Sequence, residues 1–192
     1  MATMPTSDFE TPRLRLREFT VDDVDALVEL DSDPAVMRFI TGGPPTSREE
    51  IEGVVLPHWL GLPAKTPGYG FWAAEDRESG QFIGWFHLRL RDGHPVDEPE
   101  LGYRLRRQSW GAGLATEGSR VLIDHAFTVQ GAARVVAETM AVNVASRRVM
   151  EKAGMSFVRT FLSDWPFRIP GDDQGDVEYA IERADWERTR RI

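Results

Sequence analysis

The sequence predicts an α/β domain in which helices pack on a mixed sheet. Segments with the periods of strands and helices follow one another in the order strand, helices, strands, helix, strand, helix, strands. In the middle, residues 98–127 run from a strand through a glycine turn into a long helix. The 192-residue chain contains no internal repeat and no domain linker, so we expect a single domain over residues 1–192.

The N-terminal part is expected to hold one strand and several helices. Arg13–Arg17 alternates arginine with leucine, the pattern of a half-buried strand. Thr20 is a candidate N-cap because two aspartates follow it in what would be the first helical turn. The pair Asp33-Pro34 ends that helix. The expected elements are a flexible lead-in at 1–10, a strand at 13–17, a helix at 21–31, a helical turn at 35–40 and a helix from 46 or 47 to 59 or 60.

The remaining segments predict most of the sheet. Glycines and prolines over 61–70 indicate a loop. Gly154 is a candidate C-cap for a short helix before it. The expected elements are strands at 69–75, 82–91, 100–105, 134–140, 155–161 and 177–182, a long helix from 114, a short helix at 146–153 and a helical tail at 185–190.

Composition excludes several classes of function. The chain has no cysteine, which rules out disulfides, thiolate metal sites and cysteine nucleophiles. Its net charge of −8 argues against a general nucleic-acid binder, and no apolar run is long enough to span a membrane. The N-terminus lacks the features of a signal peptide, so we expect a cytoplasmic protein. We expect no metal, because no metal-ligand spacing relates the histidines, His58, His87, His94 and His125.

The loop Gln108-Ser-Trp-Gly-Ala-Gly113 lies between the central strand and the long helix, where glycines and the free N–H groups of a helix N-terminus favour a phosphate. A P-loop is excluded because Leu114-Ala115 follows where Lys-Ser or Lys-Thr is required. A Rossmann fingerprint fails at its third position, Thr116, and too little chain follows Glu138, the acid that would bind a ribose. An ordinary strand-to-helix turn and a pyrophosphate loop of the form Gln-x-x-Gly-x-Gly remain.

The form Gln-x-x-Gly-x-Gly resembles the pyrophosphate loop of the GNAT superfamily of acyl-CoA-dependent N-acyltransferases. A second motif, Asn143-x-Ala-Ser146 followed by Glu151-Lys-x-Gly154, resembles the RimJ/RimL branch, which acetylates α-amino groups of ribosomal proteins and other amines. The opening Thr11-x-Arg-Leu-x-Leu-Arg17 also looks like that branch, and the resemblance covers about residues 11–190. It implies a GNAT fold: a mixed, mostly antiparallel sheet, splayed at the central strand and flanked by helices.

The same resemblance implies an N-acetyltransferase. Its co-substrate would be acetyl-CoA, it would need no metal, and its acceptor would be a primary amine of a small molecule or a protein N-terminus. Because the chain has no cysteine and no Ser–His pair with a recognisable spacing, we expect direct transfer without a covalent intermediate. The alternative is a catalytically silent acyl-CoA-binding sensor or interaction module. A homodimer is left open, whereas nucleic-acid and membrane partners are not expected.

The resemblance also assigns residues to the cofactor. Backbone N–H groups of the loop would hold the pyrophosphate, and Asn143 would bond the pantetheine amides. A backbone N–H near residues 103–105 would bind the thioester oxygen, and Trp110 would lie beside the cofactor. The expected cofactor-binding residues are Leu105, Gln108, Trp110, Gly111, Ala112, Gly113, Leu114, Ala115, Asn143 and Ser146.

The expected catalytic residues are Glu100, Ser146 and Tyr103. Glu100 would take the proton of the acceptor, because an ammonium has no lone pair with which to attack. Glu98 and Glu138 are alternatives that also suit structural roles. Ser146 matches the serine that this branch uses as proton donor or thiol contact, and it also suits a cap on the helix that follows.

One position departs from the family pattern. Many GNAT enzymes place a tyrosine, as general acid, where this chain has Met150, which has no proton to donate. The acid is therefore expected to be Ser146, a tyrosine such as Tyr103 or Tyr179, or solvent.

Overall fold

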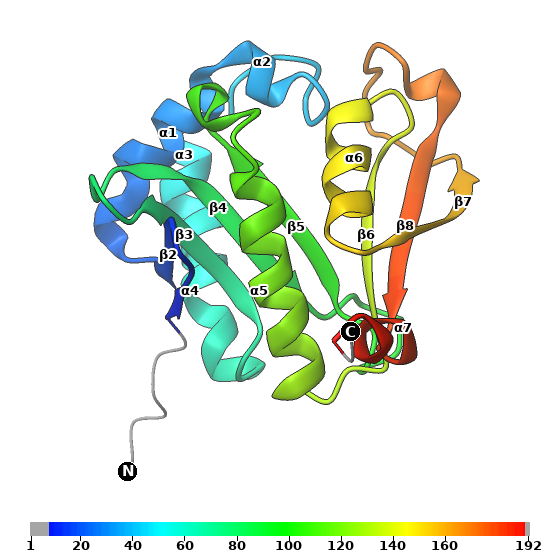
Figure 1. Ribbon diagram of the computed structural model, residues 1–192. Coiled ribbons are helices and arrows are strands. Elements are labelled where there is room, and N and C mark those ends of the chain that lie inside the picture. The colour runs from blue at the N-terminus through cyan, green and yellow to red at the C-terminus, as the bar shows by residue number, and fades with distance from the viewer. Residues whose placement is uncertain (1–7, 191–192) are drawn as a thin grey trace.

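Eight strands form one continuous sheet in the computed structural model, which describes residues 8–190 (Figure 1). Their order across the sheet is β1-β2-β3-β4-β5-β6-β8-β7, and every neighbouring pair is antiparallel except β5–β6. The predicted mixed, mostly antiparallel sheet is confirmed. The strands are β1 (Phe9–Glu10), β2 (Leu14–Glu18), β3 (Gly70–Asp76), β4 (Phe82–Arg89), β5 (Glu100–Leu105), β6 (Arg134–Met140), β7 (Ser156–Phe161) and β8 (Asp176–Glu182).

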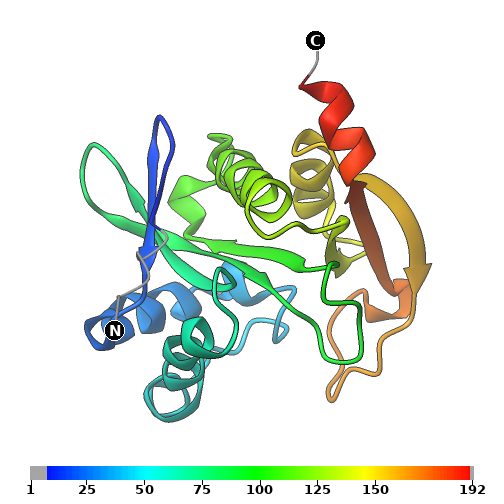
Figure 2. The ribbon, with the colours of Figure 1, turned by 90° about the horizontal axis from the view of Figure 1, so that it is seen from below.

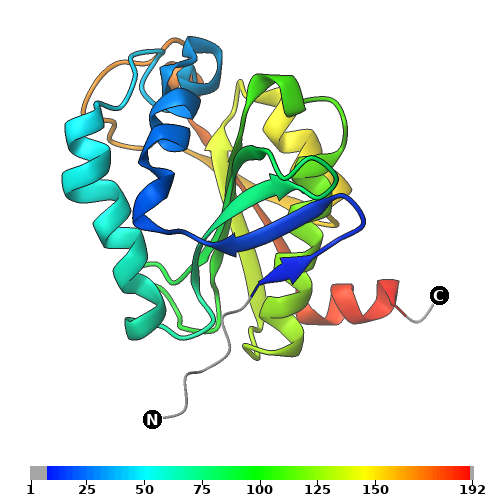
Figure 3. The same ribbon diagram turned by 90° about the vertical axis from the view of Figure 1, so that its left-hand side faces the viewer.

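Helices cover both faces of the sheet. Figure 2 and Figure 3 show α5 and α6 on one face and the first four helices on the other. None of the helices within residues 8–190 is long and apolar enough to cross a membrane. The helices are α1 (Val24–Ser32), α2 (Pro34–Met37), α3 (Arg48–Glu50), α4 (Leu56–Lys65), α5 (Leu114–Thr128), α6 (Val144–Lys152) and α7 (Arg183–Thr189), with short turns η1 (Val21–Asp23), η2 (Ile51–Val55, π-helical), η3 (Arg107–Ser109) and η4 (Asp172–Gln174).

The core has two layers, one on each face of the sheet. Phe86 and Leu88 of β4 pack in the layer that contains Leu122 of α5, whereas Trp85 of the same strand packs in the layer with α1 and α4. A strand that is covered on both faces has few positions for polar residues. This explains why β4 reads as a nearly continuous apolar run.

The alternation of leucine and arginine in β2 reflects the different surroundings of the two faces of this strand. Leu14 and Leu16 are fully buried in the α5 layer. Arg17 projects from the opposite face and forms ion pairs with Asp23 and Glu75 at 2.7 and 2.6 Å. The strand predicted at 13–17 is confirmed, shifted by one residue toward the C-terminus.

The close approach of α5 to the sheet requires a glycine. A Cβ on Gly118 would lie 2.3 Å from Cζ of Phe86, so a side chain there would force the helix and strand β4 apart. Leu122 and Ala126, one and two turns later, are fully buried on the same side of the helix. The long helix predicted from Leu114 is confirmed.

β5 and β6 meet at a single residue pair. Glu100 is in register with Val136, whose N–H donates to the carbonyl of Pro99 at 3.0 Å. Beyond this pair, β5 stays beside β4 while β6 stays beside β8, so the two strands diverge (Figure 1). The splay expected at the central strand is confirmed, and it divides the sheet into two halves.

Two predictions in the N-terminal part are wrong. Phe9–Glu10, expected in a flexible lead-in, forms β1 against β2, while residues 1–7 of that lead-in lie outside the described range. The helix expected to end at 59 or 60 continues to Lys65, although Pro63 lies inside it. One turn before Pro63 the ring of Trp59 stacks on Phe71 of the sheet at 4.3 Å, and the N–H of Thr66 closes the last turn by donating to the Leu62 carbonyl.

The short helix α6 begins two residues earlier than predicted. Asn143 is its N-cap, and the side-chain oxygen of Asn143 accepts a hydrogen bond from the N–H of Ser146. The capping role suggested for Ser146 is therefore wrong. Gly154 follows the helix end in a left-handed conformation, φ 97°, and its N–H donates to the carbonyl of Glu151, while Met155 N–H donates to Met150, which completes a Schellman motif.

We expect Gly118→Ala to destabilise the protein by about 1–3 kcal/mol, because the new methyl group overlaps the ring of Phe86. Gly61→Ala is the matched control: it is also a helical glycine, but no atom lies within 4 Å of its Cβ position, so the change should stabilise α4 by up to ~1 kcal/mol. Chemical denaturation of both variants measures the difference. Equal stabilities would show that the contact between α5 and β4 does not need this glycine.

Candidate active site

The glycine loop and the start of α5 lie at the open end of the splay. β5 ends at Leu105, η3 follows, and Gly111 and Gly113 adopt left-handed conformations with φ of 75° and 81°. Side chains other than glycine rarely adopt this conformation, which explains the two glycines. Gly113 is the N-cap of α5, so the positive end of the helix dipole faces the loop. This arrangement favours an anion.

Arg13 of the segment before β2 fixes the loop from the side. Its guanidinium donates to the carbonyl of Ala112 at 2.7 Å and to the carboxylate of Glu117 at 2.7 Å. Glu117 also accepts hydrogen bonds from the Thr11 hydroxyl and from the N–H of Arg13. These contacts connect the start of the chain to the first turn of α5. No local sequence pattern indicates these contacts, because the partners are about a hundred residues apart.

Trp110 spans the loop. Its indole N–H donates to the carbonyl of Leu105 at 2.8 Å, and 49% of the residue remains exposed. Beside the loop lies a hollow of about 380 Å³ that faces α1 and α2. The first residue of the loop, the two residues before it and residues of α1, α2 and their junction line it: Glu29, Leu30, Asp33, Val36, Arg106, Arg107 and Gln108.

Tyr103 and Ser146 link β5 to α6 across the splay. The Tyr103 hydroxyl lies 2.9 Å from Oγ of Ser146 and donates to the Ser146 carbonyl at 3.1 Å. Burial raises the pKa of Tyr103 to about 12, against a weaker opposing effect of the Ser146 hydroxyl, so the phenol keeps its proton. Asn143 is tied to the end of β6, because its amide donates to the Thr139 hydroxyl. The structure therefore brings Tyr103 of the central strand beside the Asn143-x-Ala-Ser146 motif, about forty residues further along the chain.

Glu100 lies where β5 and β6 part. Its carboxylate accepts two hydrogen bonds from Arg89, at 2.9 and 3.2 Å, and its Oε1 lies 3.7 Å from Nε2 of His87. Burial alone would raise the pKa of Glu100, but the interactions with His87 and Arg89 outweigh it and lower the pKa to about 2. The carboxylate is therefore ionised at all physiological pH values.

Glu98 and Glu138 belong to a separate network of ion pairs. Arg91 bridges the two carboxylates at 2.5 and 2.8 Å, and Arg134 connects Glu98 to Glu178. Burial raises the pKa of Glu138, although Arg91 opposes the effect. Burial therefore makes Glu138 a more basic carboxylate than an ordinary glutamate.

The other tyrosine considered as an acid is engaged elsewhere. Tyr179 is almost fully buried, donates to Glu151 at 3.0 Å and accepts from Arg147 at 3.2 Å. Met150, at the position of the family's tyrosine, is buried in the core. Only Tyr103, among the tyrosines weighed, has its hydroxyl at the splay.

His87 is the residue that sequence reasoning missed. The histidines show no metal-ligand spacing in the sequence, which leaves His87 outside any motif, and no group of three or more metal-binding side chains occurs within residues 8–190. The alternation of side chains along β4 could have identified His87, because it places His87 on the same face as Arg89. The register of β4 with β5 then pairs His87 with Gly102 and Arg89 with Glu100.

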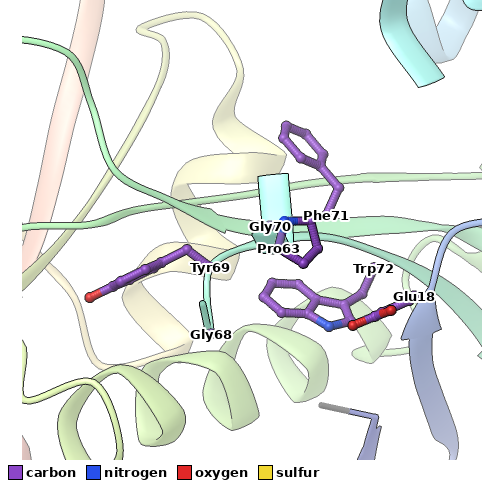
Figure 4. Close-up of a pocket in the computed structure, with 7 residues that line it drawn as sticks. All are labelled: Glu18, Pro63, Gly68, Tyr69, Gly70, Phe71 and Trp72. Atoms are coloured by element: carbon purple, nitrogen blue, oxygen red, sulfur yellow. The ribbon is translucent and has the colours of Figure 1, made fainter. Parts of the chain in front are cut away.

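A second, small pocket lies apart from the splay, where β3 begins beside the end of α4 (Figure 4). Its volume of about 20 Å³ holds little more than one water molecule. Gly68, Tyr69 and Trp72 are among its lining residues. The pocket is too small for an acyl-CoA or an acceptor.

A sheet that opens beyond a parallel strand pair, with an anion-favouring helix N-terminus at the opening, defines an acyl-CoA-dependent acyltransferase of the GNAT type. The comparisons agree with this assignment. A family model described as "Acetyltransferase (GNAT) domain" matches residues 13–156, and the chain belongs to this family. The protein is an acetyl-CoA-dependent GNAT N-acetyltransferase, which fits the RimJ/RimL resemblance.

Relatives with named activities act on different acceptors. An FsC-acetyl coenzyme A-N(2)-transacetylase of Aspergillus fumigatus is 34% identical over 188 residues, which cover 94% of this chain and 78% of that protein. A spermidine N-acetyltransferase of Vibrio cholerae, solved with CoA and spermine, shares the fold with a TM-score of 0.74 at 18% identity, covering 92% and 99% of the two chains. A ribosomal-protein-S5-alanine acetyltransferase of Vibrio fischeri has a TM-score of 0.73 at 19% identity, covering 93% and 98%.

We expect acid to reveal the ion pair of Glu100 in stability measurements. Because the folded-state pKa of about 2 lies below the ordinary value of 4.5, the stabilisation is complete above pH 4.5 and is lost as the pH falls toward 2. Glu100→Gln should remove up to about 3 kcal/mol of this pH dependence of the unfolding free energy. Glu49→Gln, at an exposed position of α3, is the control and should leave the pH dependence unchanged. Parallel curves for wild type and Glu100→Gln would contradict the lowered pKa.

Proposed function

We propose that this enzyme transfers the acetyl group of acetyl-CoA directly to a primary amine of a small molecule or a protein N-terminus. The observation that carries the proposal is the arrangement at the splay, where an ionised Glu100 marks the foot of the gap and the Tyr103–Ser146 pair bridges it. The names of the relatives support an amine acceptor, since one acts on spermidine and another on an alanine of a ribosomal protein.

The glycine loop would hold the cofactor mainly through its backbone. N–H groups at the N-terminus of α5 suit the pyrophosphate, and Arg13 keeps the loop in place by its bond to Ala112. The amides of β5 that face the gap have no strand partner in the described chain beyond Glu100, and they suit the pantetheine arm and the thioester oxygen. The proposed cofactor-binding residues are Leu105, Gln108, Trp110, Gly111, Ala112, Gly113, Leu114, Ala115, Asn143 and Ser146.

The chemistry needs one proton removed and one supplied. Glu100 would attract the acceptor's ammonium and promote the loss of its proton, after which the amine attacks the thioester carbonyl. The C–S bond then breaks as the second proton leaves the attacking nitrogen, and the Ser146 hydroxyl would relay a proton to the departing thiolate, giving up its own proton and receiving this one in exchange. Tyr103, which keeps its proton, would support Ser146 by its own hydrogen bond. No covalent enzyme intermediate and no metal are required.

The amine itself is to be found by measuring thiol release from acetyl-CoA over a panel. Spermidine, an alanyl peptide and a small α-amino acid amide represent the main chemical kinds of acceptor. Release above the rate of acetyl-CoA hydrolysis with at least one amine supports the proposal. Binding of acetyl-CoA without release for every amine would favour the silent sensor or interaction module instead.

Gly111→Glu should abolish acetyl-CoA binding, because it places bulk and a negative charge against the pyrophosphate. Gly93→Glu is a matched control: Gly93 has nearly the same φ, 76° against 75°, and no atom lies within 4 Å of either Cβ position. The control carries the same strain and charge in a loop away from the glycine motif, so its affinity should equal that of the wild type. Isothermal titration calorimetry measures both. Equal acetyl-CoA affinities of the two variants would show that the glycine loop is not part of the cofactor site.

Glu100→Gln should preserve acetyl-CoA affinity and lower turnover by about 10²–10⁴-fold, the usual contribution of a group that assists proton transfer. Glu138→Gln is the comparison, because Glu138 is the more basic carboxylate nearby. Steady-state kinetics across pH 6–9 separates the two. Near-normal turnover of Glu100→Gln over this pH range would contradict a role of Glu100 in removing the ammonium proton and would favour Glu138 or a chain of water molecules instead.

A further inference from the structure

The imidazole of His87 is buried but unsatisfied. The residue is 8% exposed, and neither ring nitrogen has a hydrogen-bond partner among residues 8–190. Its neighbours are the aromatic rings of Phe71 and Trp85, with centroids at 4.8 and 5.8 Å, and the carboxylate of Glu100. Buried polar groups in native proteins are almost always paired, so an exception calls for a functional explanation.

Space for this ring is provided by a glycine. A Cβ on Gly102 would lie 2.4 Å from Cε1 and 2.6 Å from Nε2 of His87. Gly102 does not have a positive φ, so its backbone conformation does not require glycine. The ring of His87 therefore occupies the space of the missing side chain and is held beside Glu100, two residues earlier on the same face of β5.

The distance between His87 and Glu100 suits a third group. Nε2 and Oε1 are 3.7 Å apart, which is too long for a direct hydrogen bond. A nitrogen donor at the ordinary hydrogen-bond distance of ~2.9 Å from each atom would bridge the two, and because Nε2 is buried in this structure the side chains around it would have to part to admit that donor. An ammonium is such a donor, and it would give one N–H to the carboxylate and one to the ring.

Glu100 alone is a weak proton acceptor. The ordinary pKa of a glutamate, 4.5, already lies far below that of an alkylammonium, ~10, and the neighbours of Glu100 lower it further. Burial lowers the pKa of His87 from its ordinary value of 6.5, so the ring is neutral at pH 7 and its unprotonated nitrogen has a free lone pair. The charged groups around the ring are Arg89 on its own strand and Glu100 and Arg104 on β5; β3 contributes only the uncharged Phe71. Across the splay, β6 presents Glu138 toward Glu100.

We propose that His87 is the proton acceptor of the reaction, with Glu100 as its charge partner. This inference rests on the proposed acetyl transfer to an amine. The ammonium, held between the two groups, loses a proton to Nε2: one amine N–H bond breaks, one imidazole N–H bond forms, and the freed amine lone pair attacks the thioester. Glu100 stays ionised and stabilises the imidazolium, which afterwards returns the proton to solvent.

The first test is the pH profile of His87→Gln, which nearly keeps the volume of the side chain. With the panel amine that the wild type acetylates fastest, kcat should fall about 10²–10⁴-fold while acetyl-CoA affinity is unchanged. The wild type should lose kcat/KM as the pH falls through an apparent pKa below 6.5, because the imidazolium accepts no proton; the variant should lack this limb. His125→Gln is the control, since His125 is equally buried but lies on α5, on the opposite face of the sheet, where its ring bonds the Gly68 carbonyl. Its kcat should remain near the wild-type value.

Rescue of His87→Ala separates a chemical role from a packing role. Added imidazole should restore a measurable part of kcat, whereas pyrazole, a ring of the same size and far lower basicity, should not. Equal rescue by both rings, or full activity of His87→Ala or His87→Gln, would overturn the inference while the acetyltransferase proposal stands. A wild type that acetylates no amine would overturn the proposed function and this inference with it. Thermal unfolding and acetyl-CoA titration of each variant confirm that the fold is intact.

Discussion

The site depends on one constraint, the single residue pair that joins β5 to β6. The crossover through α5 returns the chain parallel to β5, so that β6 starts beside the foot of that strand. Each strand is then held on its outer edge: β5 by β4 along its whole length, and β6 by β8 along all of its seven residues. Both halves are fixed by their own partners, so the gap between them stays open and leaves strand amides available to a ligand.

Ion pairs hold the groups around this gap in position. Arg13 ties the glycine loop to Glu117, and Arg91 and Arg134 link the carboxylates below the splay. Pairs of this kind contribute little net stability when they are exposed and can cost stability when they are buried. Their effect here is geometric. Each arginine donates to two acceptors on different elements, which fixes the distance between those elements.

Sequence patterns predicted the sheet and the ligand loop because those features are local. The alternation in β2, the glycines at 111 and 113 and the helix from Leu114 can each be read within a short window. The remaining residues of the site are brought together by the register between strands. A short stretch of sequence does not reveal that register. His87 reaches Glu100 because β4 pairs with β5 at that register, and Arg13 reaches Ala112 from the other end of the chain. The helix to Lys65 was missed for a related reason, since aromatic packing overrides the local effect of Pro63.

The choice of acceptor must come from side chains rather than from the sheet. In the proposed arrangement acetyl-CoA would meet mainly backbone groups, which tolerate sequence change. Proteins only 18–19% identical share the fold with TM-scores of 0.73 and 0.74. Their names nevertheless assign them different acceptors, an alanine of a ribosomal protein and spermidine. On the face of the sheet that carries Glu100, this chain presents the aromatic rings of Phe71 and Trp85, with Trp59 of α4 packed over them. Differences in acceptor therefore have to be sought among the residues of α1 to α4 that cover this face, not in the loop that the family shares.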